Sequence, residues 1–232
     1  MLAGQRTVVH GYVDEGVANS LSHRLRAANI DIAARGEQAP HQRALLPDVV
    51  LDVVAAVRPV AAELAELGVA WLEEPLPAAD LAGMRMLREQ TGIRVAGGEM
   101  ARSVPELLGA LEAGALDVVQ PDVVLAVGLL RARTVAELAL ARNRWFTPHT
   151  WTNGLGLLAN LHVVAGVGGG PYVEFPYDPP GWTPQRRDFF LAEPVGIDAD
   201  GLLRVPARPG LGAEIDEVAV ARWAVGGWKA VS

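Results

Sequence analysis

The amino-acid sequence predicts an α/β fold in which short parallel strands alternate with helices. Five short apolar runs recur along the chain, and each ends in a residue with useful chemistry: they are Gly68–Glu73, Ile93–Glu99, Leu116–Asp122, Trp145–His149 and Tyr172–Glu174. The segments between these runs have the length and the apolar spacing of helices. Repeated strand–helix units build a parallel sheet, and such sheets bind ligands at the carboxyl ends of their strands.

The start of the chain carries less information than the rest. Residues 1–45 mix charged, small and polar residues and show no strand-ending motif of the kind above, so this part of the chain is left as an unassigned leader. Residues 47–54 form a continuous run rich in β-branched valine, which is typical of a buried parallel strand. A helix is expected after this strand, up to about Leu67, and Pro59 marks either its first turn or a kink.

Capping signals place the later helices. Asp80 is a candidate N-cap for a helix through Arg88, and Ser103–Glu106 forms a capping box for a helix that ends at Gly114. Beyond it, the apolar spacing predicts helices near residues 129–141, 157–165 and 218–223.

Composition limits the class of protein and of ligand. A net charge of −7 argues against a nucleic-acid partner. The sequence has neither an apolar stretch long enough to span a membrane nor a signal peptide, so we expect a cytoplasmic protein without a membrane partner. With no cysteine in the chain, carboxylates and histidines are the strong metal ligands available, and they favour a hard cation such as Mg²⁺.

The strand-ending residues suggest one reaction centre. Glu73 and Glu99 end successive strands, where two carboxylates repel each other unless a cation lies between them. On the next two strands, Asp122 can fix the tautomer of His149, so that the other ring nitrogen serves as a base. A metal and a base that face one substrate suit the removal of a proton next to a carboxylate.

Other residues near these positions have plainer interpretations. We expect Glu74 to accept hydrogen bonds within its loop, Asp117 to be a solvated residue at a strand start, and His162 to have a structural role within a helix. The ordered series on consecutive strands is what distinguishes Glu73, Glu99, Asp122 and His149 from such isolated residues.

These motifs resemble a known family. Trp71-Leu72-Glu73-Glu74-Pro75, Gly97-Gly98-Glu99, Gln120-Pro121-Asp122, Pro148-His149-Thr150-Trp151 and Pro209-Gly210-Leu211-Gly212 are similar to motifs of the enolase superfamily, of the mandelate racemase and muconate lactonizing enzyme type. The resemblance covers about residues 46–223. It implies a (β/α) TIM-type barrel in which Glu73 and Glu99 bind Mg²⁺, Asp122 and His149 form the catalytic dyad, and Glu174 hydrogen-bonds the enolate intermediate.

Some features of the family have no counterpart. A capping domain, the first barrel strands and a Lys-x-Lys motif are missing, and for the third metal ligand only Asp48 and Asp52 lie near the expected position. We therefore expect an incomplete barrel of about six βα units over residues 46–190, with residues 191–232 packing back on it. An open barrel exposes strand edges, which predicts a homo-oligomer.

The resemblance implies a carbon–oxygen lyase. Its leading form is a Mg²⁺-dependent dehydratase that removes the proton α to the carboxylate of a sugar acid and then eliminates water. The alternatives are a racemase or epimerase of a carboxylate substrate, which normally needs a second base, and a truncated chain without activity.

Overall fold

The central sheet is parallel and follows the order of the chain. The structure, a computed structural model, describes residues 6–9 and 47–226, with side chains from residue 54 to residue 226. Leu72 of one strand pairs with Val95 of the next, and Ala96 in turn pairs with Val118. The sheet consists, in this order, of β2 (Leu72–Glu73), β3 (Val95–Gly97), β4 (Val118–Val119) and β5 (Trp145–Phe146).

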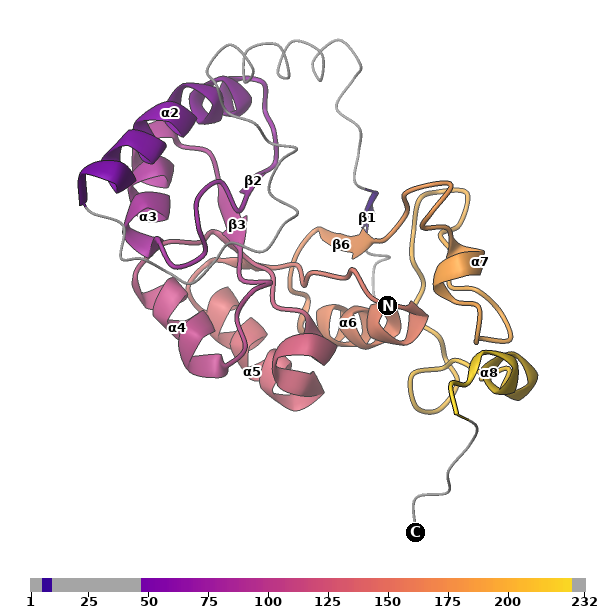
Figure 1. Cartoon of the computed structure of the whole chain (residues 1–232). Coiled ribbons are helices and arrows are strands. Elements are labelled where there is room, and N and C mark those ends of the chain that lie inside the picture. Colours follow the sequence, from indigo (N-terminus) through magenta and orange to yellow (C-terminus); the bar gives the residue numbers. More distant parts are fainter. Residues whose placement is uncertain (1–5, 10–46, 227–232) are drawn as a thin grey trace.

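Helices connect these strands, as parallel pairing requires. The connecting helices are α3 (Leu81–Thr91), α4 (Val104–Glu112), α5 (Gly128–Leu140) and α6 (Gly154–Val167), and the π-helix η1 (Val123–Val127) precedes α5. Figure 1 shows the helices following one another around the outside of the strands. Asp80 and Ser103 cap α3 and α4, which confirms both predicted helix starts. The predicted fold class, a partial (β/α) barrel, is therefore confirmed.

A sixth strand, β6 (Tyr172–Phe175), continues the series. The Phe146 N–H of β5 donates to the Gly169 carbonyl, which leads into β6, at 2.9 Å. On its other side β6 pairs in parallel with β1 (Arg6–Val9), in the register Arg6↔Tyr172. The first 45 residues, in which the sequence shows no strand-ending motif, thus include the strand Arg6–Val9, where β-branched residues pair with a partner far along the chain. The rest of the expected leader lies outside the described residues.

The strand predicted over residues 47–54 is wrong, because these residues begin helix α2 (Pro47–Glu66). Glycine is absent from this segment until Gly68, so one long helix can form and continue through Pro59. Its buried side chains, Val54, Ala61 and Leu64, recur at helical spacing. Packing of this apolar stripe outweighs the β propensity of the valines.

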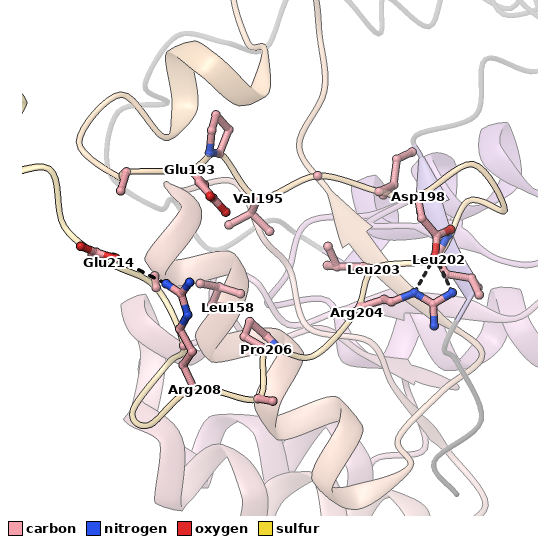
Figure 2. A pocket seen from close by; sticks show the side chains of 17 residues that line it. Leu158, Glu193, Val195, Asp198, Leu202, Leu203, Arg204, Pro206, Arg208 and Glu214 are labelled. Atoms are coloured by element: carbon pink, nitrogen blue, oxygen red, sulfur yellow. Dashed lines mark hydrogen bonds and ion pairs between the residues drawn. The ribbon is translucent and has the colours of Figure 1, made fainter.

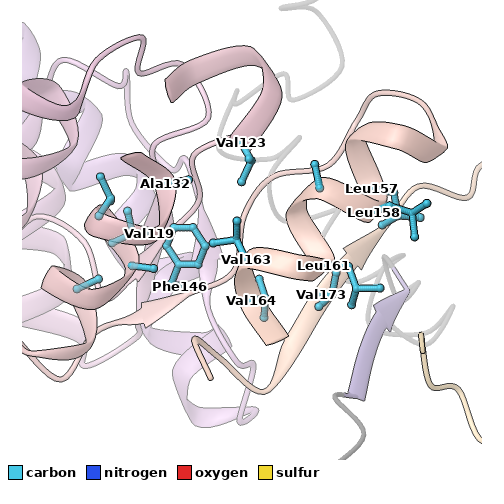
Figure 3. Packing of buried hydrophobic residues seen from close by; sticks show 14 of the residues in the cluster. Val119, Val123, Ala132, Phe146, Leu157, Leu158, Leu161, Val163, Val164 and Val173 are labelled. Atoms are coloured by element: carbon cyan, nitrogen blue, oxygen red, sulfur yellow. The ribbon is translucent and has the colours of Figure 1, made fainter. Parts of the chain in front are cut away.

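The main hydrophobic core lies between the sheet and helices α4 to α6. Figure 3 shows Phe146 of β5 beside Val163 and Val164 of α6, with Val119 of β4 nearby. Leu203 from the C-terminal part of the chain belongs to the same cluster. That part also contains α7 (Pro184–Arg187) and α8 (Glu217–Trp223).

Aromatic side chains gather where the strands begin. The ring of Trp71 lies 6.4 Å from that of Trp145 and 5.8 Å from that of Tyr172, between centroids. Trp71 and Glu73 are two positions apart, so they point to the same side of β2. The aromatic cluster therefore lies beneath the strand-end carboxylate.

No helix among the described residues combines the length and apolarity needed to cross a membrane.

Candidate active site

The strand ends line a small open cavity of about 320 Å³. The predicted residues that line it are Glu73, Glu99, His149 and Glu174, together with Trp151. Asp122 is completely buried and lies behind His149. The structure thus brings together all five residues that the sequence singled out, although they are up to about a hundred positions apart in the chain.

A larger cavity, of about 720 Å³, lies elsewhere, between α6 and the C-terminal segment (Figure 2). Its charged residues include two ion pairs, Arg204 with Asp198 at 2.7 Å and Arg208 with Glu214 at 3.4 Å. None of the predicted site residues lines this cavity. The smaller cavity is therefore the candidate active site, because the predicted carboxylates and His149 line it.

Two neutral donors hold the carboxylate of Glu73. Gln120 Nε2 donates to Glu73 Oε2 at 2.8 Å, and Trp71 Nε1 donates to the same oxygen at 3.2 Å. Gln120 is nearly fully buried, so this hydrogen bond is shielded from water. Sequence reasoning missed Gln120, although its position two residues before Asp122, at the end of the same apolar run, was an available signal.

Glu99 extends from a backbone turn that requires glycine. Gly98 has a φ of +113°, and a Cβ atom at this position would lie 3.2 Å from Leu107 Cδ2. Any other residue at this position would have an unfavourable backbone conformation and a close contact with Leu107. The turn lets Glu99 reach the cavity, where its Oε2 lies 3.6 Å from His149 Nε2.

Asp122 and His149 face each other across adjacent strand ends. Asp122 Oδ2 lies 3.4 Å from His149 Nδ1, while Oδ1 accepts hydrogen bonds from the N–H groups of Val124 and Leu125 in η1. Burial disfavours the charged imidazolium, but the hydrogen bond that its ring N–H donates to Asp122 and the negative charges of Glu174 and Glu99 outweigh this effect, so the pKa of His149 is raised. His149 is thus oriented through Nδ1 and presents Nε2 to the cavity.

Two further carboxyl groups belong to the site: Glu174 lines the cavity, and Glu74 interacts electrostatically with the residues that line it. Glu174 accepts a short hydrogen bond from the Thr150 N–H, which ties β6 to the loop that follows His149. Glu74 has a φ of +39°, and its Oε1 is buried without a hydrogen-bond partner. Burial and the nearby charge of Glu99 raise the pKa of Glu74, against the effect of a hydrogen bond from Gly98. Glu74 is therefore part of the electrostatics of the site as well as of its loop.

The donor set suits a hard cation held by few protein ligands. Glu73 and Glu99 offer carboxylate oxygens from neighbouring strands. Among the described residues, no group of three or more His, Asp or Glu side chains is placed to hold a metal ion. The candidate third ligands, Asp48 and Asp52, belong to the part of α2 whose side chains are not described.

Two further residues lie away from the cavity. Asp117 was expected to be solvated, and this is wrong: it accepts hydrogen bonds from Arg88 Nε at 2.7 Å and from the Val95 N–H at 3.2 Å, and it also pairs with Arg144. It joins β3, β4 and two neighbouring segments at the start of the strands. His162 Nε2 lies 3.2 Å from the Leu211 carbonyl oxygen, a contact to the C-terminal segment.

The sequence matches a family model described as enolase C-terminal domain-like over residues 38–219. The 3,6-anhydro-α-L-galactonate cycloisomerase of Streptomyces coelicolor is 33% identical over 178 residues, which cover 75% of this chain and 44% of that protein. The D-galactarolactone cycloisomerase of Agrobacterium fabrum is 31% identical over 67% of this chain and 42% of its own length. The arabinonate dehydratase of Saccharolobus solfataricus is 32% identical, over 66% of this chain and 39% of its own length. This chain thus spans less than half the length of these curated relatives.

Solved structures share the fold. A crystal structure titled as a predicted mandelate racemase from Rhodobacter sphaeroides is 32% identical, with a TM-score of 0.67, and the match covers 77% of this chain and 45% of that one. The 3,6-anhydro-D-galactonate cycloisomerase of Zobellia galactanivorans is 25% identical, with a TM-score of 0.63, and the match covers 75% and 55% of the two chains.

Proposed function

Since the chain belongs to the enolase superfamily, of the mandelate racemase and muconate lactonizing enzyme type, we propose that it acts as a Mg²⁺-dependent acid-sugar dehydratase. The observation that carries the proposal is the pairing of buried Asp122 with His149 beside a cavity lined by three carboxylates. One ring nitrogen is oriented by Asp122, and the other faces the space that a substrate would occupy. This is the arrangement of a general base.

The reaction follows from these positions. His149 Nε2 takes the proton from the carbon next to the substrate carboxylate, and the C–H electron pair moves into the carboxylate group to give an enolate. As those electrons return, the bond between the β-carbon and its hydroxyl breaks. The imidazolium of His149 gives its proton to the departing hydroxide, which leaves as water, and the resulting enol rearranges to a 2-keto acid.

Other residues stabilise the charges that appear along this path. Asp122 stabilises the imidazolium through Nδ1. We assign Glu174, which lines the cavity, to hydrogen-bond one enolate oxygen. Glu73 and Glu99 would hold Mg²⁺, and a bound Mg²⁺ would supply the positive charge that stabilises the enolate oxygens. Gln120 and Trp71 orient Glu73 for that task.

A cycloisomerase is a second candidate, favoured by the three cycloisomerases among the similar proteins named above. A 3,6-anhydro acid carries its ring oxygen on the β-carbon, so the same proton removal can expel an ether oxygen in place of hydroxide. The ring then opens without loss of water. A racemase or epimerase fits less well, because the described residues contain no lysine that could serve as a second base.

Proton exchange tests the proposal more directly than product formation does. The chain is incubated with Mg²⁺ and a panel of aldonic, aldaric and 3,6-anhydro acids in D₂O, and loss of the α-proton signal is followed by NMR. We expect exchange with at least one acid, and a loss of roughly a hundredfold or more in His149→Asn, the usual contribution of a general base.

The matched control is His162→Asn, the same substitution at a histidine outside the cavity. Equal exchange rates in His149→Asn and in the parent chain would refute the role of His149. The products distinguish the two candidates: a 2-keto acid that has lost water indicates the dehydratase, and an isomer of unchanged mass from the 3,6-anhydro acid indicates the cycloisomerase.

The Mg²⁺ site has a separate test. Calorimetry should detect weak Mg²⁺ binding to the chain, which is lost in Glu99→Gln and kept in Glu112→Gln, where an exposed carboxylate on α4 is neutralised. Equal heats for Glu99→Gln and the parent chain would refute the assignment of Glu99 as a ligand.

A further inference from the structure

A buried amide connects the separate parts of the site. Asn160 lies in the middle of α6, has no exposed surface and is surrounded by apolar residues of the same helix. It donates to the His149 carbonyl at 3.0 Å and to Thr150 Oγ1 at 2.9 Å, and it accepts the Val123 N–H at 3.0 Å. A polar group buried in an apolar helix costs free energy unless it is hydrogen-bonded, and this one is.

The partners determine which way the amide points. The Val123 N–H can only donate, so it requires the amide oxygen, and the His149 carbonyl can only accept, so it requires the amide nitrogen. A carboxylate at this position would lack both donors, and a hydroxyl has a single proton to give. Among residues of this size, only a primary amide donates twice and accepts once.

The geometry points to Asn160 as the residue that positions the proposed catalytic dyad. Val123 directly follows Asp122, and the carbonyl that Asn160 binds belongs to His149 itself. Thr150, its third partner, donates its N–H to Glu174. One side chain thus joins the backbone behind the acid, the base and the third carboxylate.

The hydrogen bonds of Asn160 matter because the distance between Asp122 and His149 depends on the positions of their backbone segments. Asp122 Oδ1 is held by two N–H groups of η1, so the position of Oδ2 follows the backbone of η1. The distance between Oδ2 and His149 Nδ1 is 3.4 Å, long for a hydrogen bond. A small shift between the two backbone segments would break this contact, and the Asn160 amide opposes such a shift. The inference rests on the proposed function, because it needs Asp122 and His149 to act as a pair.

The test reads the tautomer of His149 and needs no substrate. Nitrogen NMR of the full chain labelled in its histidines, at a pH where the rings are neutral, distinguishes the Nδ1–H form from the Nε2–H form, and His149→Asn identifies the signals. In the parent chain we expect mainly the Nδ1–H form. In Asn160→Leu, which removes all three hydrogen bonds, and in Asn160→Asp, which removes both donors, the ratio of Nδ1–H to Nε2–H should fall about fivefold, as expected for the loss of one hydrogen bond.

Asn153→Ala is the matched control, because Asn153 caps the start of the same helix through the Leu155 and Gly156 N–H groups. It weakens α6 without touching the dyad, so it should leave the tautomer ratio unchanged. A parent-like ratio in a folded Asn160 variant would overturn the inference, and so would loss of folding in both variants, since the amide would then support the whole core. If Asp122→Asn also leaves the ratio unchanged, the dyad itself, and with it the proposed function, is wrong.

Discussion

Replacing Asp122 by Asn should lower the pKa of His149 by a measurable amount. The substitution keeps the shape of the side chain and removes the negative charge that lies 3.4 Å from Nδ1. Asp122 is fully buried and the His149 side chain is only 18% exposed, so water screens this pair weakly. A hydrogen bond to a charged group contributes about 1.5–3 kcal/mol, which is large enough for an NMR titration to detect its loss.

The assay is an NMR titration of the His149 ring protons in the parent chain and in Asp122→Asn, in the presence of a chelator. The chelator keeps cations away from Glu99 and Glu174, whose negative charges also raise the pKa of His149. The same pKa for His149 in both proteins would refute the argument that Asp122 stabilises the imidazolium.

Four other predictions follow from the geometry. Because the folded-state pKa of His149 is raised, the stability that protonated His149 contributes is complete below the unfolded pKa of about 6.5 and is lost as pH rises through the folded pKa. In urea unfolding, the free energy of unfolding of the parent chain should therefore fall across this pH range, and that of His149→Asn should not show this fall. Gln120→Leu should weaken Mg²⁺ binding by about tenfold to a hundredfold in calorimetry, since Glu73 loses a donor; unchanged affinity would remove Gln120 from the site. Asp117→Asn should lower the free energy of unfolding by about 2–4 kcal/mol in urea, because two arginines lose their partner, and a change below about 0.5 kcal/mol would count against that role. Strand β2 is at an edge among the described strands, so sedimentation velocity should detect self-association, and a monomer at all concentrations would contradict it.

The strand ends were predictable because two local signals agree there. An apolar run indicates a buried strand, and the polar residue after it marks the edge where ligands bind. This logic placed Glu73, Glu99, Asp122, His149 and Glu174 around one centre before any contact was known. Helix caps such as Asp80 and Ser103 were predictable for a similar reason, since their hydrogen bonds reach only three residues along the chain.

Contacts between distant segments were not predictable in the same way. Gln120 reaches Glu73 across 47 positions, and Asn160 reaches Val123 across 37. In the sequence alone, Gln120 and Asn160 look like any other polar residues. Asp117 misled the prediction because its arginine partners come from two other parts of the chain, Arg88 from α3 and Arg144 from the connection before β5.

The error in α2 has a different origin. Val49, Val50, Val53 and Val54 form a run that satisfies the pattern of a buried strand, and the same valines also fit one face of a helix. For short apolar runs, periodicity alone cannot separate the two structures. The deciding feature was the absence of glycine up to Gly68, which allows a helix of 20 residues.

The hydrogen bond from Trp71 to Glu73 gives the site an optical reporter. An indole whose N–H is bonded to a carboxylate experiences the field of that charge, and a cation arriving at Glu73 would change the field and with it the emission of Trp71. Subtracting the spectrum of Trp71→Phe from that of the parent chain would isolate this signal from the five other tryptophans. Cation occupancy could then be followed continuously by fluorescence, in the absence of any substrate and on the millisecond timescale of stopped-flow mixing.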